Sequence, residues 1–250
     1  MKLADFSPAK FRSSLARRGL LGTLQVGFSH LLGPLALYSP RRVAKRIRDR
    51  SYDRRYGVDT SLAIDLDKLR IESASAALAH RYQASTERSF HETLAHVPVR
   101  RHEDFVFIDF GSGKGKCLLM ASDYPFKKII GVEFAAELNE VARSNFARYR
   151  SPRQKCRTLE SVHADATTYA LPADPGVYYF YNPFEAPLLS VVLENIRRSL
   201  DDRPRKLYVV YFNPAYREVF DSAAWLVPLK RDRDFCIYEN RTDPPGVTAT

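Results

Sequence analysis

The residues best suited to chemistry lie in a glycine-rich run at positions 109–115, with the sequence Asp-Phe-Gly-Ser-Gly-Lys-Gly. The run follows an apolar segment typical of a strand and precedes a segment typical of a helix. Glycines in this context let the backbone turn tightly and approach a ligand closely. The spacing excludes a P-loop, because Cys117 stands where the lysine of GxxxxGK[ST] would fall. It also excludes the GxGxxG dinucleotide loop, because Lys116 stands at the third glycine position.

The pattern Asp-x-Gly-x-Gly-x-Gly does fit this run, at Asp109, Gly111, Gly113 and Gly115. In this motif the chain resembles class I S-adenosylmethionine-dependent methyltransferases, over roughly residues 100–240. The Gly-Ser-Gly-Lys-Gly loop, which includes Ser112, and the segment YDRRYGVDTS are similar to those of uncharacterised bacterial members. The loop also resembles the Asp-Leu-Gly-Ser-Gly loop of histone-core-type lysine methyltransferases. The resemblance implies a methyltransferase that uses S-adenosylmethionine, with these loop residues in the cofactor site.

Acidic residues follow the next two predicted strands. Glu133 lies 18 residues after Gly115, where an acid can accept hydrogen bonds from the ribose hydroxyls of either S-adenosylmethionine or NAD. The alternative is an acid that caps a helix. The resemblance implies that Asp165 takes the adenine amino group, with the neighbouring Phe134 and Ala166 also in the cofactor site, whereas the alternative for Asp165 is a loop cap.

A further motif, Tyr181-Asn182-Pro183-Phe184, ends the fourth predicted strand. It resembles the Asn/Asp-Pro-Pro-aromatic motif of amino-methylating family members. The resemblance implies that the Asn182 side chain and a backbone carbonyl at Pro183 accept hydrogen bonds from a target amine, that Phe184 walls the acceptor and that Tyr181 assists. One proline stands where the motif has two, which counts against a flat nucleobase acceptor and leaves a lysine or other amine open. The alternative is a strand-end turn with a core phenylalanine, as at the second Asn-Pro pair, residues 213–214.

Aromatic residues fill the strand before this motif, and aromatic faces attract a cationic sulfonium. We therefore expect some of residues 178–181 to line the site, but only alternate members, because neighbouring side chains of a strand point to opposite faces.

Upstream, residues 82–86 (Tyr-Gln-Ala-Ser-Thr) are similar to a Tyr-x-Pro-Ser/Thr loop that closes over the cofactor in histone-core-type lysine methyltransferases. Ala84 stands in place of the proline. The resemblance implies that Tyr82 and Thr86 belong to the cofactor site, while Thr86-Glu87 also fits a helix start. Methyl transfer requires no metal, and the sequence shows neither a metal-ligand spacing nor a Ser/His/Asp set.

Short apolar runs alternate with helical segments from residue 105 onward. Seven runs predict strands, at residues 105–110, 127–134, 158–165, 177–184, 206–214, 225–229 and 235–240. Three segments between the first five predict helices, at residues 116–124, 135–150 and 186–200. The alternation predicts an α/β fold with a Rossmann-like, mostly parallel, seven-stranded sheet. The short connection before the last run predicts an antiparallel edge hairpin.

The composition places this chain of 250 residues among globular proteins, with 45% apolar and 27% charged residues. The net charge of +10 is concentrated in residues 1–55, which hold 13 Lys and Arg against 3 Asp and Glu. We therefore expect a basic helical extension over residues 1–56, a helical lead-in over 57–104, a catalytic domain over 105–242 and a flexible tail over 243–250.

The basic tract at residues 41–55 predicts docking to an acidic surface, which a nucleic acid, a membrane or a protein could provide. The apolar stretch at residues 20–38 is interrupted by Gln25, His30 and Gly33-Pro34, which favours a broken helix pair or peripheral membrane contact over a membrane span. Three cysteines without a CxxC pair favour a reducing cytoplasm. The methyl acceptor stays open among a protein lysine, a small amine and RNA or DNA, and a non-catalytic binding protein of this fold is the further alternative.

Overall fold

The computed structural model describes residues 40–61 and 86–241. The chain divides into two units, residues 1–48 and 49–250, with the boundary inside the first described helix. The helices are α2 (Pro40–Tyr56), α3 (Glu87–Leu94), the 3-10 turn η4 (His102–Asp104), α4 (Lys116–Ala121), α5 (Ala136–Arg148), α6 (Ala186–Asp202) and α7 (Arg217–Asp221). The strands are β1 (Val106–Phe110), β2 (Lys128–Glu133), β3 (Leu159–His163), β4 (Gly176–Tyr181), β5 (Leu207–Phe212), β6 (Leu226–Arg231) and β7 (Phe235–Asn240).

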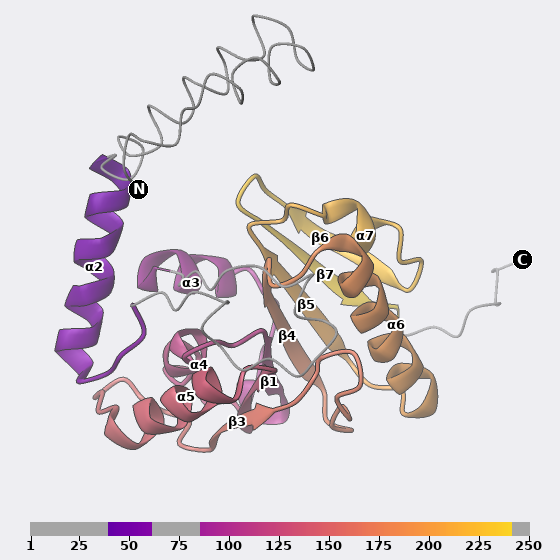
Figure 1. Cartoon of the computed structure of the whole chain (residues 1–250). Helices are drawn as coiled ribbons and strands as arrows, with labels where there is room; N and C mark the ends of the chain where they lie inside the picture. Colours follow the sequence, from indigo (N-terminus) through magenta and orange to yellow (C-terminus); the bar gives the residue numbers. More distant parts are fainter. Residues whose placement is uncertain (1–39, 62–85, 242–250) are drawn as a thin grey trace, which may run out of the picture. The chain divides into compact units, whose positions relative to one another are not determined.

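The seven strands form one sheet in the order β3-β2-β1-β4-β5-β7-β6 (Figure 1). The first five strands are parallel, β7 runs antiparallel to β5, and β6 runs antiparallel to β7. The predicted α/β fold with a mostly parallel sheet and an antiparallel edge hairpin is therefore confirmed. All seven predicted strands and all three predicted helices form, and α7 is an additional short helix that the sequence analysis did not anticipate.

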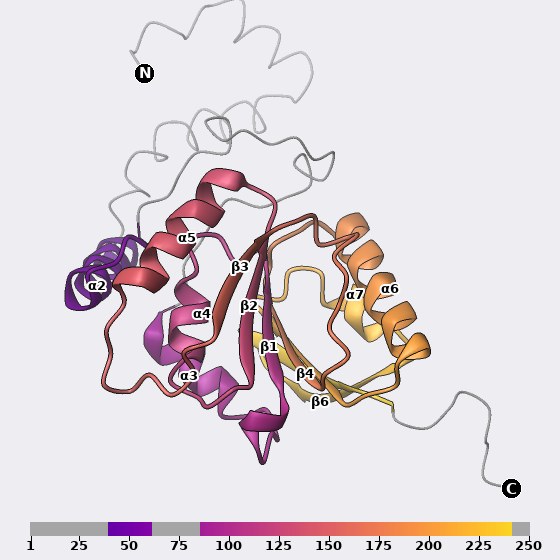
Figure 2. The same cartoon turned by 90° about the horizontal axis from the view of Figure 1, so that it is seen from below.

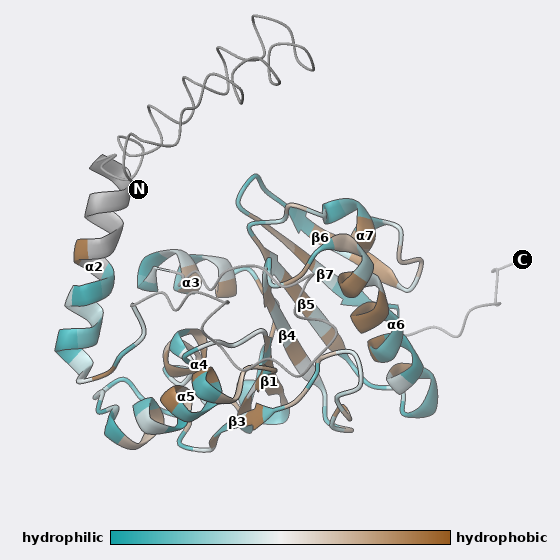
Figure 3. Cartoon of the chain, in the orientation of Figure 1, coloured by the Kyte–Doolittle hydropathy of each residue, from teal (hydrophilic) through white to brown (hydrophobic). Residues whose placement is uncertain are grey.

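Helices cover both faces of the sheet, with α4 and α5 on one side and α6 and α7 on the other (Figure 2). Alternate residues of each central strand serve the two faces: Phe107 and Tyr179 pack with α3 and α4, whereas Ile108 and Tyr178 pack with α6. Apolar residues accordingly gather on the strands and along the buried side of α6 (Figure 3). A parallel sheet buried on both faces requires strands that are almost entirely apolar, as β4 and β5 are and as β1 is apart from Asp109.

Residues 52–58, at the end of α2 and just after it, belong to the same core as the sheet. Tyr52, Tyr56 and Val58 are buried in the cluster formed with α3 and α4. Packing therefore continues across residues 56 and 57, where the sequence analysis divided the extension from the lead-in. The apolar stretch at residues 20–38 and the tail at 243–250 lie outside the described residues.

The edge strand β6 has a register shift between Pro228 and Lys230 in its pairing with β7. Pro228 has no backbone N–H to donate to a ladder.

Among the described residues, no helix is long and apolar enough to cross a membrane.

The two faces of α6 allow a direct test of the core. Ile196 is fully buried against the sheet, whereas Val191 on the same helix is 47% exposed. We expect Ile196→Ala to lower the free energy of unfolding by about 2–5 kcal/mol, because it leaves a cavity. We expect Val191→Ala to change it by about 0.5 kcal/mol or less. Urea unfolding of both variants measures the difference, and equal effects would contradict the packing described for α6.

Candidate functional site at the carboxyl ends of the strands

The glycine run forms the turn from β1 into α4. Gly111, Gly113 and Gly115 have φ angles of 76°, 54° and 79°, in the left-handed region that favours glycine. Gly115 is followed directly by the first residue of α4. Three glycines at alternate positions therefore allow the tight reversal from strand to helix that the sequence analysis predicted.

The turn after β4 packs directly on this loop. A β-carbon placed on Gly111 would lie only 2.7 Å from Cβ of Pro183, so a side chain at Gly111 would collide with the Asn-Pro turn. The two turns meet because β1 and β4 are neighbours, with Phe110 opposite Phe180. In the strand order, β1 connects outward to β2 and β3 on one side, while β4 connects to β5 on the other. Open α/β sheets bind ligands outside the carboxyl ends of the strands at such a switch point.

The acid at the end of β2 also reaches the loop. Oε2 of Glu133 accepts a hydrogen bond from the Gly113 N–H at 2.8 Å, and Oε1 accepts one from the Ala135 N–H at 2.9 Å. Burial raises the pKa of Glu133, and these backbone N–H groups act against that rise. Burial and the negative charge of Glu133 raise the pKa of Asp109 well above its usual value. The first two predicted motifs are thus in direct contact.

Ser112 faces the sheet with its side chain. A β-carbon on Gly131 of β2 would lie 2.5 Å from Oγ of Ser112, so Gly131 makes room for this hydroxyl. The hydroxyl is buried and has no hydrogen-bond partner among the described residues. Ser112 can therefore present only its backbone to a ligand above the loop.

The predicted adenine site is formed by a turn after β3. Oδ1 of Asp165 accepts hydrogen bonds from the N–H of Thr167 at 2.8 Å and from its hydroxyl at 2.7 Å. Ala166 is buried in the core, and the Phe134 carbonyl contacts the His163 ring at 2.9 Å. Asp165 thus has the turn-capping role given as the alternative, and its role toward adenine stays a prediction.

The fourth motif is fixed by a tyrosine that sequence analysis did not single out. Asn182 has a φ angle of 41°, which an asparagine tolerates better than most residues. The Tyr211 hydroxyl accepts a hydrogen bond from the Tyr216 N–H at 3.2 Å and donates its own proton to Oδ1 of Asn182 at 2.8 Å. One lone pair of the Asn182 amide oxygen is thereby used, and the second remains for another donor.

Most of the aromatic tract belongs to the core and does not form a site wall. Tyr178, Tyr179 and Phe180 are fully buried, and Phe184 is only 3% exposed. The alternative of a core phenylalanine therefore describes Phe184 in this structure. Tyr181 alone among residues 178–181 is partly exposed, at the end of β4, where burial raises its pKa to about 12.

Two predicted residues lie upstream of the sheet. Thr86 forms the N-cap of α3, where its side chain accepts a hydrogen bond from the Ser89 N–H at 3.2 Å, so the predicted helix start is confirmed. Tyr82 lies outside the described residues. Among residues 40–61 and 86–241, no group of three His, Cys, Asp or Glu side chains is arranged to hold a metal ion.

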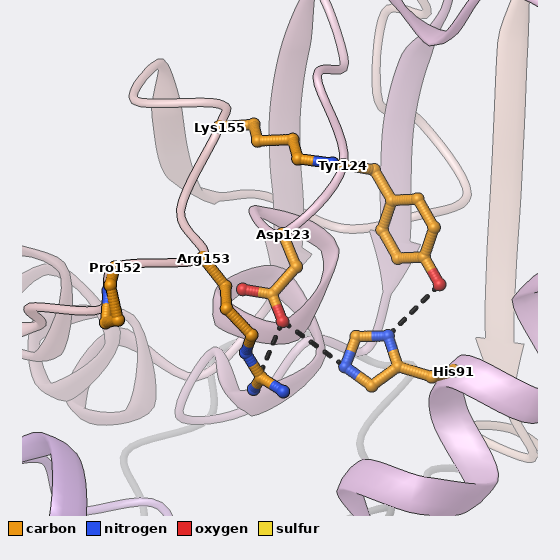
Figure 4. Close-up of a pocket in the computed structure, with 6 residues that line it drawn as sticks. All are labelled: His91, Asp123, Tyr124, Pro152, Arg153 and Lys155. Carbon is orange, nitrogen blue, oxygen red and sulfur yellow. Dashed lines mark hydrogen bonds and ion pairs between the residues drawn. The ribbon is translucent and has the colours of Figure 1, made fainter.

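A separate hollow of about 370 Å³ lies at the other end of the strands, near the amino ends of β2 and β3 (Figure 4). Its residues come from the connections α4–β2 and α5–β3, which enter the strands at their amino ends, and from α3. Asp123 contacts Arg153 at 3.2 Å and His91 at 3.4 Å, and His91 contacts the Tyr124 hydroxyl at 3.1 Å. These lining groups are paired with one another, and the hollow is separate from the glycine loop.

Comparisons with protein-family models and with curated proteins found no match. Among solved structures, the chain is similar to the 23S rRNA methyltransferase ErmE, with 13% identity, 67% of this chain and 73% of that chain covered, and a TM-score of 0.45. It is similar to the mitomycin 7-O-methyltransferase MmcR, with 14% identity, 62% and 54% covered, and a TM-score of 0.44. It is also similar to the ribosomal protein L11 methylase from Lactobacillus delbrueckii subsp. bulgaricus, with 12% identity, 70% and 86% covered, and a TM-score of 0.45. The fold assignment rests on the strand order of this chain itself.

The contact between Gly111 and Pro183 can be tested against a glycine with free space around it. Gly57 also has a left-handed φ of 68°, but nothing lies within 4 Å of a β-carbon placed there. Both alanine substitutions cost about 1–2 kcal/mol in backbone strain. We expect Gly111→Ala to lower the free energy of unfolding by about 1–3 kcal/mol more than Gly57→Ala, because only the former overpacks. Denaturant unfolding measures the difference, and equal losses would show that Pro183 does not crowd Gly111.

Proposed function

We propose that this chain is an S-adenosylmethionine-dependent methyltransferase that methylates an amine nitrogen. The observation that carries the proposal is the meeting of three motifs at the switch point of the sheet. The glycine loop contacts Glu133 through Gly113 and contacts the Asn-Pro turn through Gly111. A cofactor held by the loop and Glu133 at this end of the sheet would lie beside Asn182, which is where an acceptor has to be.

The residues of the loop fit this cofactor in their chemistry. The carboxylate of Glu133 accepts hydrogen bonds from the Gly113 and Ala135 N–H groups, and the Phe134 N–H also acts on it. A carboxylate has about four lone-pair sites, so it keeps acceptor capacity for a ribose hydroxyl. The glycine loop removes side chains from the surface that the cofactor would approach. When bound, S-adenosylmethionine supplies a methyl group already activated by the positive sulfonium.

The protein's own part is to orient the acceptor and exclude water. The nitrogen must be neutral, so that its lone pair can form the new N–C bond as the S–C bond breaks and the electron pair returns to sulfur. The second lone pair of Oδ1 of Asn182 and the backbone carbonyl of Pro183 can accept hydrogen bonds from this nitrogen. Tyr211 holds the Asn182 amide for that purpose, and the amine loses its extra proton to solvent after transfer.

The fourth motif supports the proposed acceptor class. The motif has a single proline, and Phe184 at its aromatic position is buried and offers no platform for a flat base, so we favour a protein lysine or a small amine over a nucleobase. The basic residues at 41–55 would then dock the protein to an acidic surface of its partner. RNA or DNA as the acceptor, and cofactor binding without catalysis, are the alternatives that the experiments below separate.

Calorimetry with S-adenosylmethionine tests the cofactor. We expect micromolar binding, on the order of −8 kcal/mol. Gly113→Asp should abolish binding, because the new carboxylate would enter the loop beside Glu133 and the two negative groups would repel each other. Val191→Asp, which adds the same charge on the exposed side of α6, should bind like the unmodified chain. Absence of binding at millimolar ligand would overturn the proposal.

The acceptor site is tested by replacing Asn182 with glycine, which keeps the left-handed backbone and removes the amide. We expect Asn182→Gly to bind S-adenosylmethionine normally and to lose methyl transfer. Asn213→Gly, at the adjacent strand end with a φ of 53°, is the matched control and should retain transfer. Transfer is followed as labelled methyl entering protein, RNA or small molecules in a lysate. Label in RNA would favour the nucleic-acid alternative, and full transfer by Asn182→Gly would remove Asn182 from the mechanism.

A further inference from the structure

Two buried lysines connect the glycine loop region to residues 49–61 through ion pairs. Nζ of Lys114 lies 3.0 Å from both carboxylate oxygens of Asp59, and Nζ of Lys116 lies 2.7 Å from Oδ1 of Asp49. Both lysine side chains are only 2% exposed. A buried lysine is strongly unfavourable unless a carboxylate neutralises it, so these pairs fix where the segment lies. Both cations are thereby used within the protein.

The segment itself is held in a defined hook after α2. Asp53 accepts hydrogen bonds from the backbone N–H groups of Thr60 and Ser61 at 3.0 and 2.9 Å, and from both of their hydroxyls. The Val58 N–H donates to the Asp53 carbonyl at 3.0 Å. Asp59 is therefore presented to the loop from a rigid turn.

Asn145 of α5 bonds to the hook and to the loop at once. Its amide oxygen accepts from the Asp59 N–H, and its amide nitrogen donates to the carbonyls of Asp59 and Lys114, all at 2.9 Å. This side chain is fully buried. Lys114 is thus held twice, by its side chain through Asp59 and by its backbone through Asn145.

Lys114 is the residue that lies between the left-handed Gly113 and Gly115. Glycine has the largest conformational freedom of any residue, so a loop built on glycines keeps one shape only when something else restrains it. We propose that residues 49–61 form a brace, and that Asp59 of this brace and Asn145 of α5 act as positioning residues that keep the glycine loop in the shape needed for the cofactor. This inference rests on the proposed cofactor, and it makes cofactor affinity depend on a segment more than 50 residues upstream of the loop.

The test uses the full chain and the variant Lys114→Met, which keeps the bulk and removes the cation. Asp59 is 40% exposed and can be hydrated when its partner is lost. We expect the dissociation constant for S-adenosylmethionine to rise about tenfold or more. Lys127→Met, which breaks an exposed pair with Asp174, should leave it unchanged. Ile196→Ala, which destabilises the fold far from the loop, should also leave it unchanged at a temperature where all variants are folded.

A second measurement separates the brace from the proposed function. Hydrogen exchange of peptides covering residues 110–117 should be faster in Lys114→Met than in Lys127→Met, with or without cofactor. If Lys114→Met does not fold, Asp59→Asn takes its place in both measurements. Unchanged exchange and unchanged affinity in these variants, with binding intact in the unmodified chain, would overturn the brace and leave the proposed function standing. If the unmodified chain fails to bind, the proposed function is lost, and the exchange rates alone decide whether the brace shapes the loop.

Discussion

The close approach of two turns at the carboxyl ends of β1 and β4 sets the geometry of the site. Pro183 packs where a side chain of residue 111 would be, so this residue has to be glycine and its backbone has to reverse. From that reversal the chain continues through Gly113, which contacts Glu133, into α4. The acid, the loop and Asn182 therefore share one location because two neighbouring strands end against each other.

Buried ionisable groups of both signs lie close to this site. Asp109 and Glu133 bring two acids under the loop, while Lys114 and Lys116 place two cations behind it, each paired with its own aspartate. Burial disfavours the ionised form of the two acids, whereas the charge of each lysine is balanced by the carboxylate of the aspartate that it contacts. The site is thus shaped by groups that are expensive to rearrange, which suits a reaction that depends on positioning.

The fold could be predicted from the sequence because its signals are local. Apolar runs such as residues 105–110 and 206–214 have the length and composition of buried strands, and the glycines mark the turn between strand and helix. The partners of the loop lysines could not be predicted, because Lys114 and Asp59 are 55 positions apart and Asn145 and Asp59 are 86 apart. The role of the aromatic residues 178–181 could not be predicted for a related reason. Their composition fits both a site wall that attracts a cation and a core strand buried on both faces, and it is the packing of helices on both faces that places most of them in the core.

The outermost strand of the antiparallel hairpin has a consequence for the behaviour of the protein in solution. An unpaired strand edge invites a second sheet to add to it, and natural proteins discourage this with proline, bulges and charge. β6 combines all three, in Pro228, the register shift that follows it, and the cationic Lys230 and Arg231. Two copies of this chain are therefore discouraged from pairing through their β6 edges into one continuous sheet.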